Sequence, residues 1–166
     1  NVSGASNVAI GADALTANTA SYNTAVGHRA GYSNTTGTQI TAIGRQALYS
    51  NTTGNNNTAT GHNALLVNTT GAQNTAIGEA ALTANTTASN NTAVGYRAGY
   101  LNTIGHDSVF LGYQAAYFNI SGDNLVAVGH QSLYSNTTGR FNTAIGHSAL
   151  LDNTDGDHNT AVGYVA

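Results

Sequence analysis

The sequence predicts an all-β protein folded as a parallel β-solenoid of about ten coils, and three observations support this prediction. A glycine that follows an aliphatic or β-branched residue recurs along the whole chain, at Gly11, Gly27, Gly44, Gly61, Gly78, Gly95, Gly112, Gly129, Gly146 and Gly163. The step is 17 residues, except for the first, which is 16. The consensus N-T-A-[VI]-G-x-x-A-L-x-x-N-T-T-G-x-x is too poor in helix formers, and too short, for a helical hairpin repeat of about 34 residues.

The first element of each coil is a predicted strand at N-T-A-[VI]. Its Thr position is also occupied by Val, as the members of this row show: Val8, Thr24, Thr41, Thr58, Thr75, Thr92, Val109 and Val126. A position that accepts Val is expected to face the interior. The β-branched residue two places later then faces inward as well, and the Ala between them faces the other side of the strand.

A second strand is expected at Ala-Leu, which Tyr often follows, as in Leu48-Tyr49 and Leu133-Tyr134. Two strands of about five residues joined by tight turns use up one period. The Leu and Tyr rows would then form a long apolar strip on the outside of a single chain.

Two further positions are nearly invariant from coil to coil. The glycine after the strand, here called the anchor glycine, is expected at a corner where a Cβ would collide with neighbouring backbone. An asparagine follows seven residues later in each complete coil, at Asn18, Asn34, Asn51, Asn68, Asn85, Asn102, Asn119, Asn136 and Asn153. Coils stacked about 4.8 Å apart would place these amides in a hydrogen-bonded ladder along the axis.

Residues 1–166 are expected to form one repetitive segment. Both ends fall within a repeat, and no capping unit is recognisable, so we expect the solenoid to continue further or to stack end to end. Because a single coil encloses a thin core and leaves apolar rows outside, we also expect a homo-oligomer.

The composition argues against several classes of function. Charged residues are 7% of the chain, and the formal net charge is −3, with no basic stripe to bind nucleic acid. No apolar run is long enough for a membrane helix. No triad, phosphate loop or carboxylate pair recurs with useful spacing, so we expect no catalysis and no cofactor.

The motif resembles two families of repeats. It is present as Asn74-Thr75-Ala76-Ile77-Gly78 followed by Ala81-Leu82 and Asn85-Thr86-Thr87. It resembles the head repeats of YadA-like trimeric autotransporter adhesins, with their N-S-V-A-I-G motif, and more closely the NTAVG-type repeats of phage and bacterial tail-fibre proteins. The resemblance covers essentially the whole chain. It implies a left-handed solenoid, a trimer, and attachment or spacing on a virion or cell surface.

Candidate ligand-binding residues lie directly after the anchor glycine, where the coils differ most. They are His28, Arg29, Arg45, His62, Tyr96, Arg97, Tyr113, His130 and His147. Freedom from the repeat suggests solvent exposure. A merely solvated corner and a face that binds a glycan or protein receptor are both compatible with this composition.

The sequence contains two possible metal sites, and neither is favoured. His130 and His147 lie one coil apart but lack a supporting carboxylate. Asp152, Asp155 and Asp157 cluster without the glycine-rich pattern of calcium-binding β-rolls, and an ordinary polar turn is the simpler interpretation.

Nine Asn-x-Ser/Thr sequons are present, at Asn1, Asn34, Asn51, Asn56, Asn68, Asn85, Asn90, Asn119 and Asn136. Turns already favour Asn and Thr, which accounts for the sequons without glycosylation.

The sequence therefore favours a structural or adhesive segment of an extracellular surface fibre, which contacts a receptor or glycan through the variable corner. One alternative is an ice-binding solenoid that uses its Thr rows. The other is an extracellular filament polymerised end to end.

Overall fold

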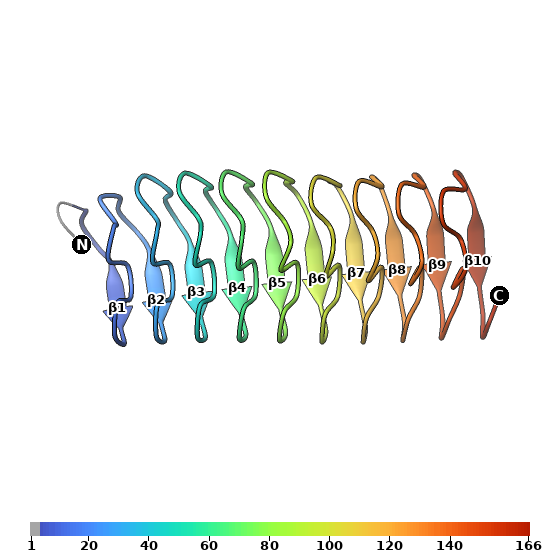
Figure 1. Ribbon diagram of the computed structural model, residues 1–166, viewed down its shortest axis with the longest axis horizontal. Coiled ribbons are helices and arrows are strands. Elements are labelled where there is room, and N and C mark those ends of the chain that lie inside the picture. Colours follow the sequence, from blue (N-terminus) through green and yellow to red (C-terminus); the bar gives the residue numbers. More distant parts are fainter. Residues whose placement is uncertain (1–3) are drawn as a thin grey trace.

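The computed structural model describes residues 4–166 as a parallel β-solenoid of about nine turns (Figure 1). Each turn contributes one three-residue strand, and the part of the chain described contains no helix. The strands are β1 (Val8–Ile10), β2 (Thr24–Val26), β3 (Thr41–Ile43), β4 (Thr58–Thr60), β5 (Thr75–Ile77), β6 (Thr92–Val94), β7 (Val109–Leu111), β8 (Val126–Val128), β9 (Thr143–Ile145) and β10 (Thr160–Val162). Accordingly, no described helix is long and apolar enough to cross a membrane.

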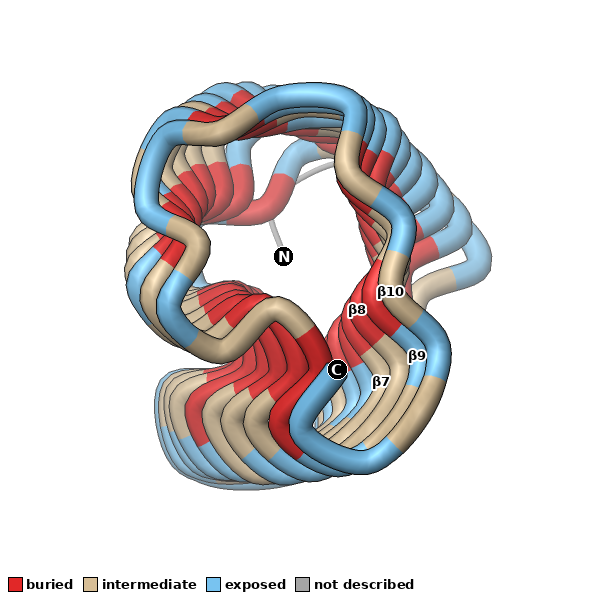
Figure 2. Tube along the Cα trace, turned by 90° about the vertical axis from the view of Figure 1, so that its right-hand side faces the viewer, coloured by how far each residue is buried: buried red, intermediate tan, exposed pale blue. Residues whose placement is uncertain are grey.

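The ten strands form one parallel sheet in sequence order, from β1 to β10. Each strand pairs with the next at the same position of the repeat, so that Thr24 lies opposite Thr41 and Ala25 opposite Ala42. Figure 2 looks along the rod and shows the coils stacked, with buried positions aligned in stripes. The predicted solenoid is therefore confirmed.

The predicted orientation of the strand was wrong. The central Ala faces the interior and is fully buried in β2 to β6, whereas Thr24 is half-buried and Ile43 and Ile77 are about 40% exposed. Alternation determines which residues share a face, but it does not decide which face is inside. That choice follows from space, because the interior opposite each strand is filled by larger side chains from the rest of the coil.

Those larger side chains come from the segment that was predicted as a second strand, and this prediction was also wrong. The segment is a series of turns in which Leu48, Leu65, Leu82 and Leu133 adopt φ of 49° to 51° and are fully buried. Leucine rarely adopts this left-handed conformation, which costs roughly 1 kcal/mol or more. Burial of the side chain in the core opposes that cost. The Leu row is therefore core and is not part of an outer apolar strip.

The anchor glycine lies at a corner as predicted. Gly27 has φ of 134°, and a Cβ built there would lie 2.6 Å from the carbonyl oxygen of Gly44 in the next coil. Both the backbone conformation and the approach of the neighbouring coil exclude a side chain. The corner sharply changes the chain direction and places the next two residues at the end of each strand (Figure 1).

Candidate binding surface

The nine asparagines of the predicted ladder are stacked along the rod. Each side-chain amide from Asn34 onward donates to the side-chain oxygen of the Asn one coil earlier, at 2.7 to 3.4 Å. The same Nδ2 also donates to the carbonyl three residues later, as from Asn68 to Gly71 at 2.9 Å. Since Asn18 through Asn136 are fully buried, these bonds satisfy amides that water cannot reach.

A second buried Asn row was missed in the sequence analysis. It comprises the first residue of the N-T-A motif and includes Asn23, Asn57, Asn74, Asn91 and Asn142, all fully buried. Asn74 donates through Nδ2 to the Ala88 carbonyl at 2.8 Å, and its backbone N–H donates to Oδ1 of Asn57 at 2.9 Å. The repetition of this Asn in the consensus was the available signal.

Burial also limits modification of the sequons. Asn34, Asn51, Asn68, Asn85, Asn119 and Asn136 are fully buried, so a glycan cannot be attached to them in the folded rod. Asn56 and Asn90 are exposed. Asn1 lies outside the described residues.

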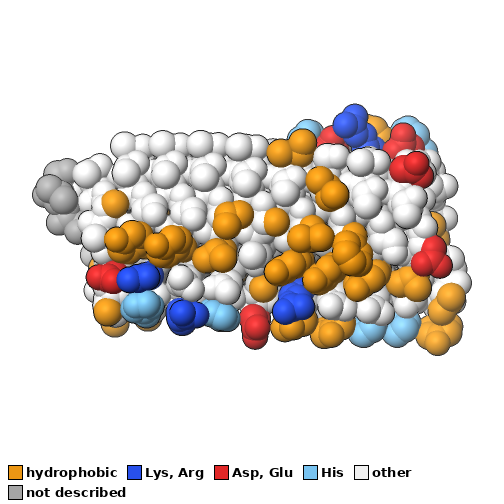
Figure 3. Space-filling model, in the orientation of Figure 1, with side chains coloured by type: hydrophobic (Ala, Val, Ile, Leu, Met, Phe, Trp, Pro, Cys, Tyr) orange, Lys and Arg blue, Asp and Glu red, His pale blue; other side chains and the backbone are white. Residues whose placement is uncertain are grey.

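The position directly after the anchor glycine forms a row along one edge of the rod, here called the corner row. It consists of Ala12, His28, Arg45, His62, Glu79, Tyr96, Tyr113, His130, His147 and Tyr164. All of these residues are exposed except Tyr96, which is half-buried, as are the candidates Arg29 and Arg97 one position later. In Figure 3 this edge is the lower one. Arg, His and acidic side chains lie along it, and a band of hydrophobic side chains lies above it.

The second half of the corner row is a continuous stack of five rings. Tyr96 stacks on Tyr113 at 5.3 Å between centroids, Tyr113 on His130 at 5.0 Å, and His130 on His147 at 4.6 Å. Tyr164 completes the series at 5.2 Å from His147. Because the rings cover one another's faces, they present their edges to solvent. The surface therefore offers hydroxyls and ring nitrogens for hydrogen bonds.

A second row of tyrosines lies four residues further along in five of the coils and is half-buried. Tyr32 stacks on Tyr49 at 5.2 Å, and Tyr100, Tyr117 and Tyr134 stack at 5.1 and 5.4 Å. This row remains on the outside of the rod, unlike the Leu row predicted to accompany it.

The arginines beside these rows make different contacts in different coils. Nε of Arg29 donates to Oδ2 of Asp13 at 3.3 Å, and Nη1 of Arg45 lies 3.0 Å from Nε2 of His62. The guanidinium carbon of Arg97 lies 5.0 Å from the ring centre of Tyr96 and 5.3 Å from that of Tyr100. Nε of Arg97 is buried and has no hydrogen-bond partner.

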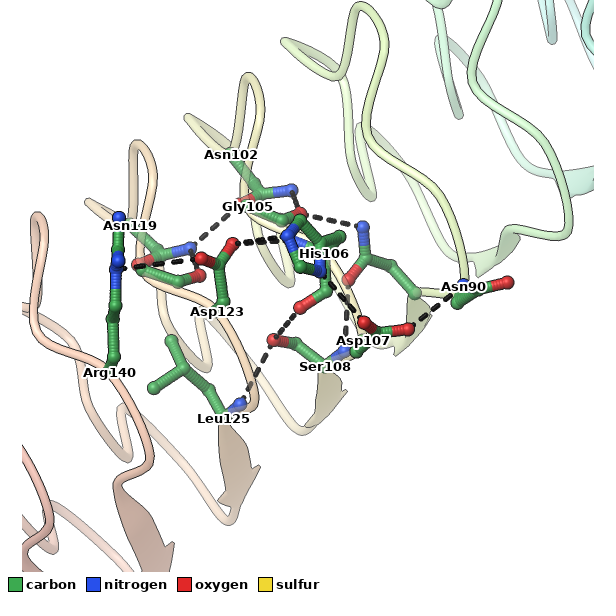
Figure 4. A network of polar contacts seen from close by, with 12 residues as sticks. Asn90, Asn102, Gly105, His106, Asp107, Ser108, Asn119, Asp123, Leu125 and Arg140 are labelled. Carbon is green, nitrogen blue, oxygen red and sulfur yellow. Dashed lines mark hydrogen bonds and ion pairs between the residues drawn. The ribbon is translucent and has the colours of Figure 1, made fainter.

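A separate polar network occupies another turn of the rod (Figure 4). The His106 ring contacts Asp107 at 2.8 Å and Asp123 at 3.4 Å, and Asp123 also pairs with Arg140 at 3.5 Å. The hydrogen bond from His106, followed by that from Asn90, lowers the pKa of Asp107. Each partner lies on an adjacent coil or next in the chain, so the network ties four successive turns together.

Neither the His130–His147 pair nor the acidic cluster near Asp155 gathers three ligands. Within residues 4–166, no group of three or more His, Asp or Glu side chains is placed to hold a metal ion. Asp157 accepts a hydrogen bond from the backbone N–H of Arg140 at 2.6 Å, and Asp155 contacts the Thr154 hydroxyl at 3.2 Å. No pocket opens in the described surface.

The ring stack and the arginines beside it are thus the most distinctive surface of the rod. Comparisons of the chain with protein-family models, curated proteins and solved structures found no match.

Proposed function

We propose that this solenoid is a structural and adhesive rod within an extracellular fibre, either a virion tail fibre or a cell-surface adhesin. The observation that carries the proposal is the division of each coil into constant and variable parts. The paired strands and the buried Asn rows repeat from coil to coil, whereas the corner row changes at nearly every step. Such a rod holds chosen side chains at fixed intervals, which suits spacing and attachment.

The proposed rod is a homo-oligomer, most simply a left-handed trimer as the family resemblance implies. Its support is an apolar row on the outer face of the sheet, where Ile10, Ile43, Ile77, Ile145 and Val162 are 40% to 67% exposed. Ten strands of three residues give this face about 480 Å². A stable interface needs about 800 Å² per partner. The outer sheet face alone is therefore smaller than a stable interface. A closed trimer compensates for this, because each chain contacts two neighbours and can bury surface against both.

Sedimentation velocity tests the assembly. Ile77→Asp places a charge on the outer sheet face and is expected to dissociate the oligomer, whereas Thr87→Asp, at an exposed turn position, serves as the control. A wild-type chain that sediments as a stable monomer would contradict the proposed oligomer.

Adhesion is tested by coating beads with the protein and measuring their attachment to candidate host cells. Replacing Tyr113, His130 and His147 together by Ala is expected to abolish attachment, because the centre of the ring stack is lost. The same triple replacement at exposed Thr53, Thr70 and Thr87 is the control. Equal attachment by both variants would remove the ring stack from the proposed function.

A second candidate, ice binding, is favoured by one observation. The hydroxyls of Thr41, Thr58, Thr75 and Thr92 lie on the outer side of consecutive strands, and none is hydrogen-bonded to another described residue. By contrast, the Thr35 hydroxyl donates to the Thr52 carbonyl at 2.9 Å, and this pattern recurs along its row. Thermal hysteresis that disappears when Thr58 and Thr75 become Val would establish this alternative; no hysteresis in the wild type would eliminate it.

A further inference from the structure

The side chain of Arg97 differs from those of the other three arginines in having no polar partner among the described residues. Arg29 and Arg140 pair with aspartates, and Arg45 contacts His62. No described side chain accepts a hydrogen bond or forms an ion pair with Arg97. Its nearest acidic neighbour in the corner row is Glu79, one coil earlier, with which it makes no ion pair.

The Arg97 side chain is nevertheless held in place. Its guanidinium lies beside two tyrosine rings, Tyr96 and Tyr100, at 5.0 and 5.3 Å, and its Nε is covered by protein. Stacking against aromatic rings orients the guanidinium plane and reduces the freedom that a ligand would otherwise have to restrict. The two terminal nitrogens therefore form a positioned fork of donors that the protein itself does not use.

We propose that Arg97, with Tyr96 and Tyr100, binds a carboxylate of an acidic polysaccharide that lies along the corner row. The inference rests on the adhesive function proposed above and specifies its ligand. A guanidinium fork matches the two oxygens of a carboxylate. Beyond it, the ring edges of Tyr113, His130 and His147 follow at steps of about 5 Å and supply hydrogen bonds to sugar hydroxyls.

The distribution of charge favours a saccharide over an acidic peptide. One arginine, Arg97, lies beside the stacked half of the corner row. The ring edges of that row follow it, as do the amides of Gln114 and Gln131, which bond to each other at 3.0 Å. An acidic peptide presents carboxylates without hydroxyl groups, and it would find one cation here on a protein of net charge −3. A uronic acid polymer carries hydroxyl groups beside each carboxylate and meets both kinds of group.

The test is binding of polygalacturonate fragments to the full chain, measured by isothermal titration calorimetry. Arg97→Gln is expected to weaken binding about tenfold, as loss of a charge-assisted hydrogen bond predicts. Gln is the natural residue at this position in other coils, with the same φ, as Gln114 at 53° shows, so the fold should be preserved. Arg29→Gln is the matched control, because Arg29 occupies the same position and is already paired with Asp13; its binding should be unchanged.

Three further arms complete the design. Glu79→Gln is expected to tighten binding, since it removes the nearest negative charge in the row. Methyl-esterified polygalacturonate should bind as weakly to the wild type as polygalacturonate binds to Arg97→Gln, and poly-glutamate should bind more weakly than polygalacturonate. The proposal fails if the ester binds as well as the acid, if poly-glutamate binds equally, or if both Arg variants lose affinity alike.

The experiment separates this inference from the adhesive function. If Arg97→Gln leaves polygalacturonate binding unchanged while the ring-stack triple variant still abolishes cell attachment, the ligand assignment is wrong and the adhesive function stands. If Arg97→Gln instead changes the sedimentation of the protein, Arg97 belongs to a contact between copies and the ligand assignment is also overturned.

Discussion

Gly99 and Phe110 share one place in the core. A Cβ built on Gly99 would lie 2.6 Å from Cδ2 of Phe110, which is fully buried. In most other coils the position of Gly99 holds Leu, and the position of Phe110 holds Ala. The large side chain has thus moved from the turn of one coil to the strand of the next. Gly31 is a related case: a Cβ there would lie 2.9 Å from Cδ2 of Leu15 and 3.6 Å from Cδ1 of Ile40, which replaces an Asn of the second row.

This exchange predicts strong coupling between the two sites. Gly99→Leu alone should destabilise the rod by about 1 to 3 kcal/mol through overpacking, and Phe110→Ala alone by about 3 to 5 kcal/mol through a cavity. The double variant restores the Leu and Ala of other coils and should lose clearly less than the sum. Urea denaturation of all four proteins measures the coupling. Additive losses would mean that the two side chains do not occupy the same space.

The corner glycine predicts a contrast between two Gly→Ala substitutions. Gly27→Ala forces a side chain into φ of 134° and against Gly44, so we expect a loss above about 3 kcal/mol. Gly163→Ala is the control: this last anchor glycine has a similar φ of 141°, but a Cβ there would lie 3.6 Å from Cβ of Ala166, which is an ordinary contact. Its loss should be about 1 kcal/mol, from the backbone conformation alone. Thermal denaturation of both variants gives the comparison, and similar midpoints would contradict the role of the neighbouring coil at the corner.

The Asn ladder predicts a position-dependent loss. Asn68→Ala removes the donors to Asn51 and Gly71 and leaves the amide of Asn85 without one of its two acceptors, all in a fully buried place. We expect a loss of about 3 kcal/mol or more, because unsatisfied buried groups cost about 1 to 3 kcal/mol each.

Asn153→Ala is the control for this ladder. Asn153 is half-buried and lies in the last complete coil, where water can replace its bonds to Asn136 and Gly156. Its effect on the urea midpoint should be less than half as large. Equal effects would show that burial does not determine how much each Asn of the ladder contributes to the free energy of unfolding.

The network of Figure 4 predicts a measurable titration. Hydrogen bonds from His106 and Asn90 lower the pKa of Asp107. Since the folded-state pKa lies below the unfolded value, the network stabilises the rod above the unfolded pKa, and this contribution is lost as the pH falls through the folded pKa. Asn90→Ala should raise the pKa of Asp107, as measured by carbon NMR of its carboxyl group. Asn124, at the equivalent position on the other side, makes no hydrogen bond to Asp107, so Asn124→Ala should leave the titration unchanged.

Much of the fold was predictable because equivalent positions of successive coils must satisfy the same structural constraint and therefore carry similar residues. The 17-residue period, the strand at N-T-A-[VI] and the glycine corner each follow from local backbone chemistry, which a sequence records directly. The Asn ladder from Asn18 to Asn153 likewise follows from stacking, whereas the second Asn row was not predicted. The polar and charged candidates at the corner were recognised by their variability, but their contacts were not.

The tertiary structure alone decided what depends on space between segments. Ala25 faces inward and Ile43 outward because Leu side chains across the coil fill the interior, a fact that alternation along a strand does not contain. The pairing of Gly99 with Phe110 likewise depends on a volume shared by two coils. The lack of a polar partner for the Arg97 side chain among the described residues depends on which side chains the adjacent coils carry. A position in the repeat determines where the Cα lies, but it does not determine the contacts of the side chain.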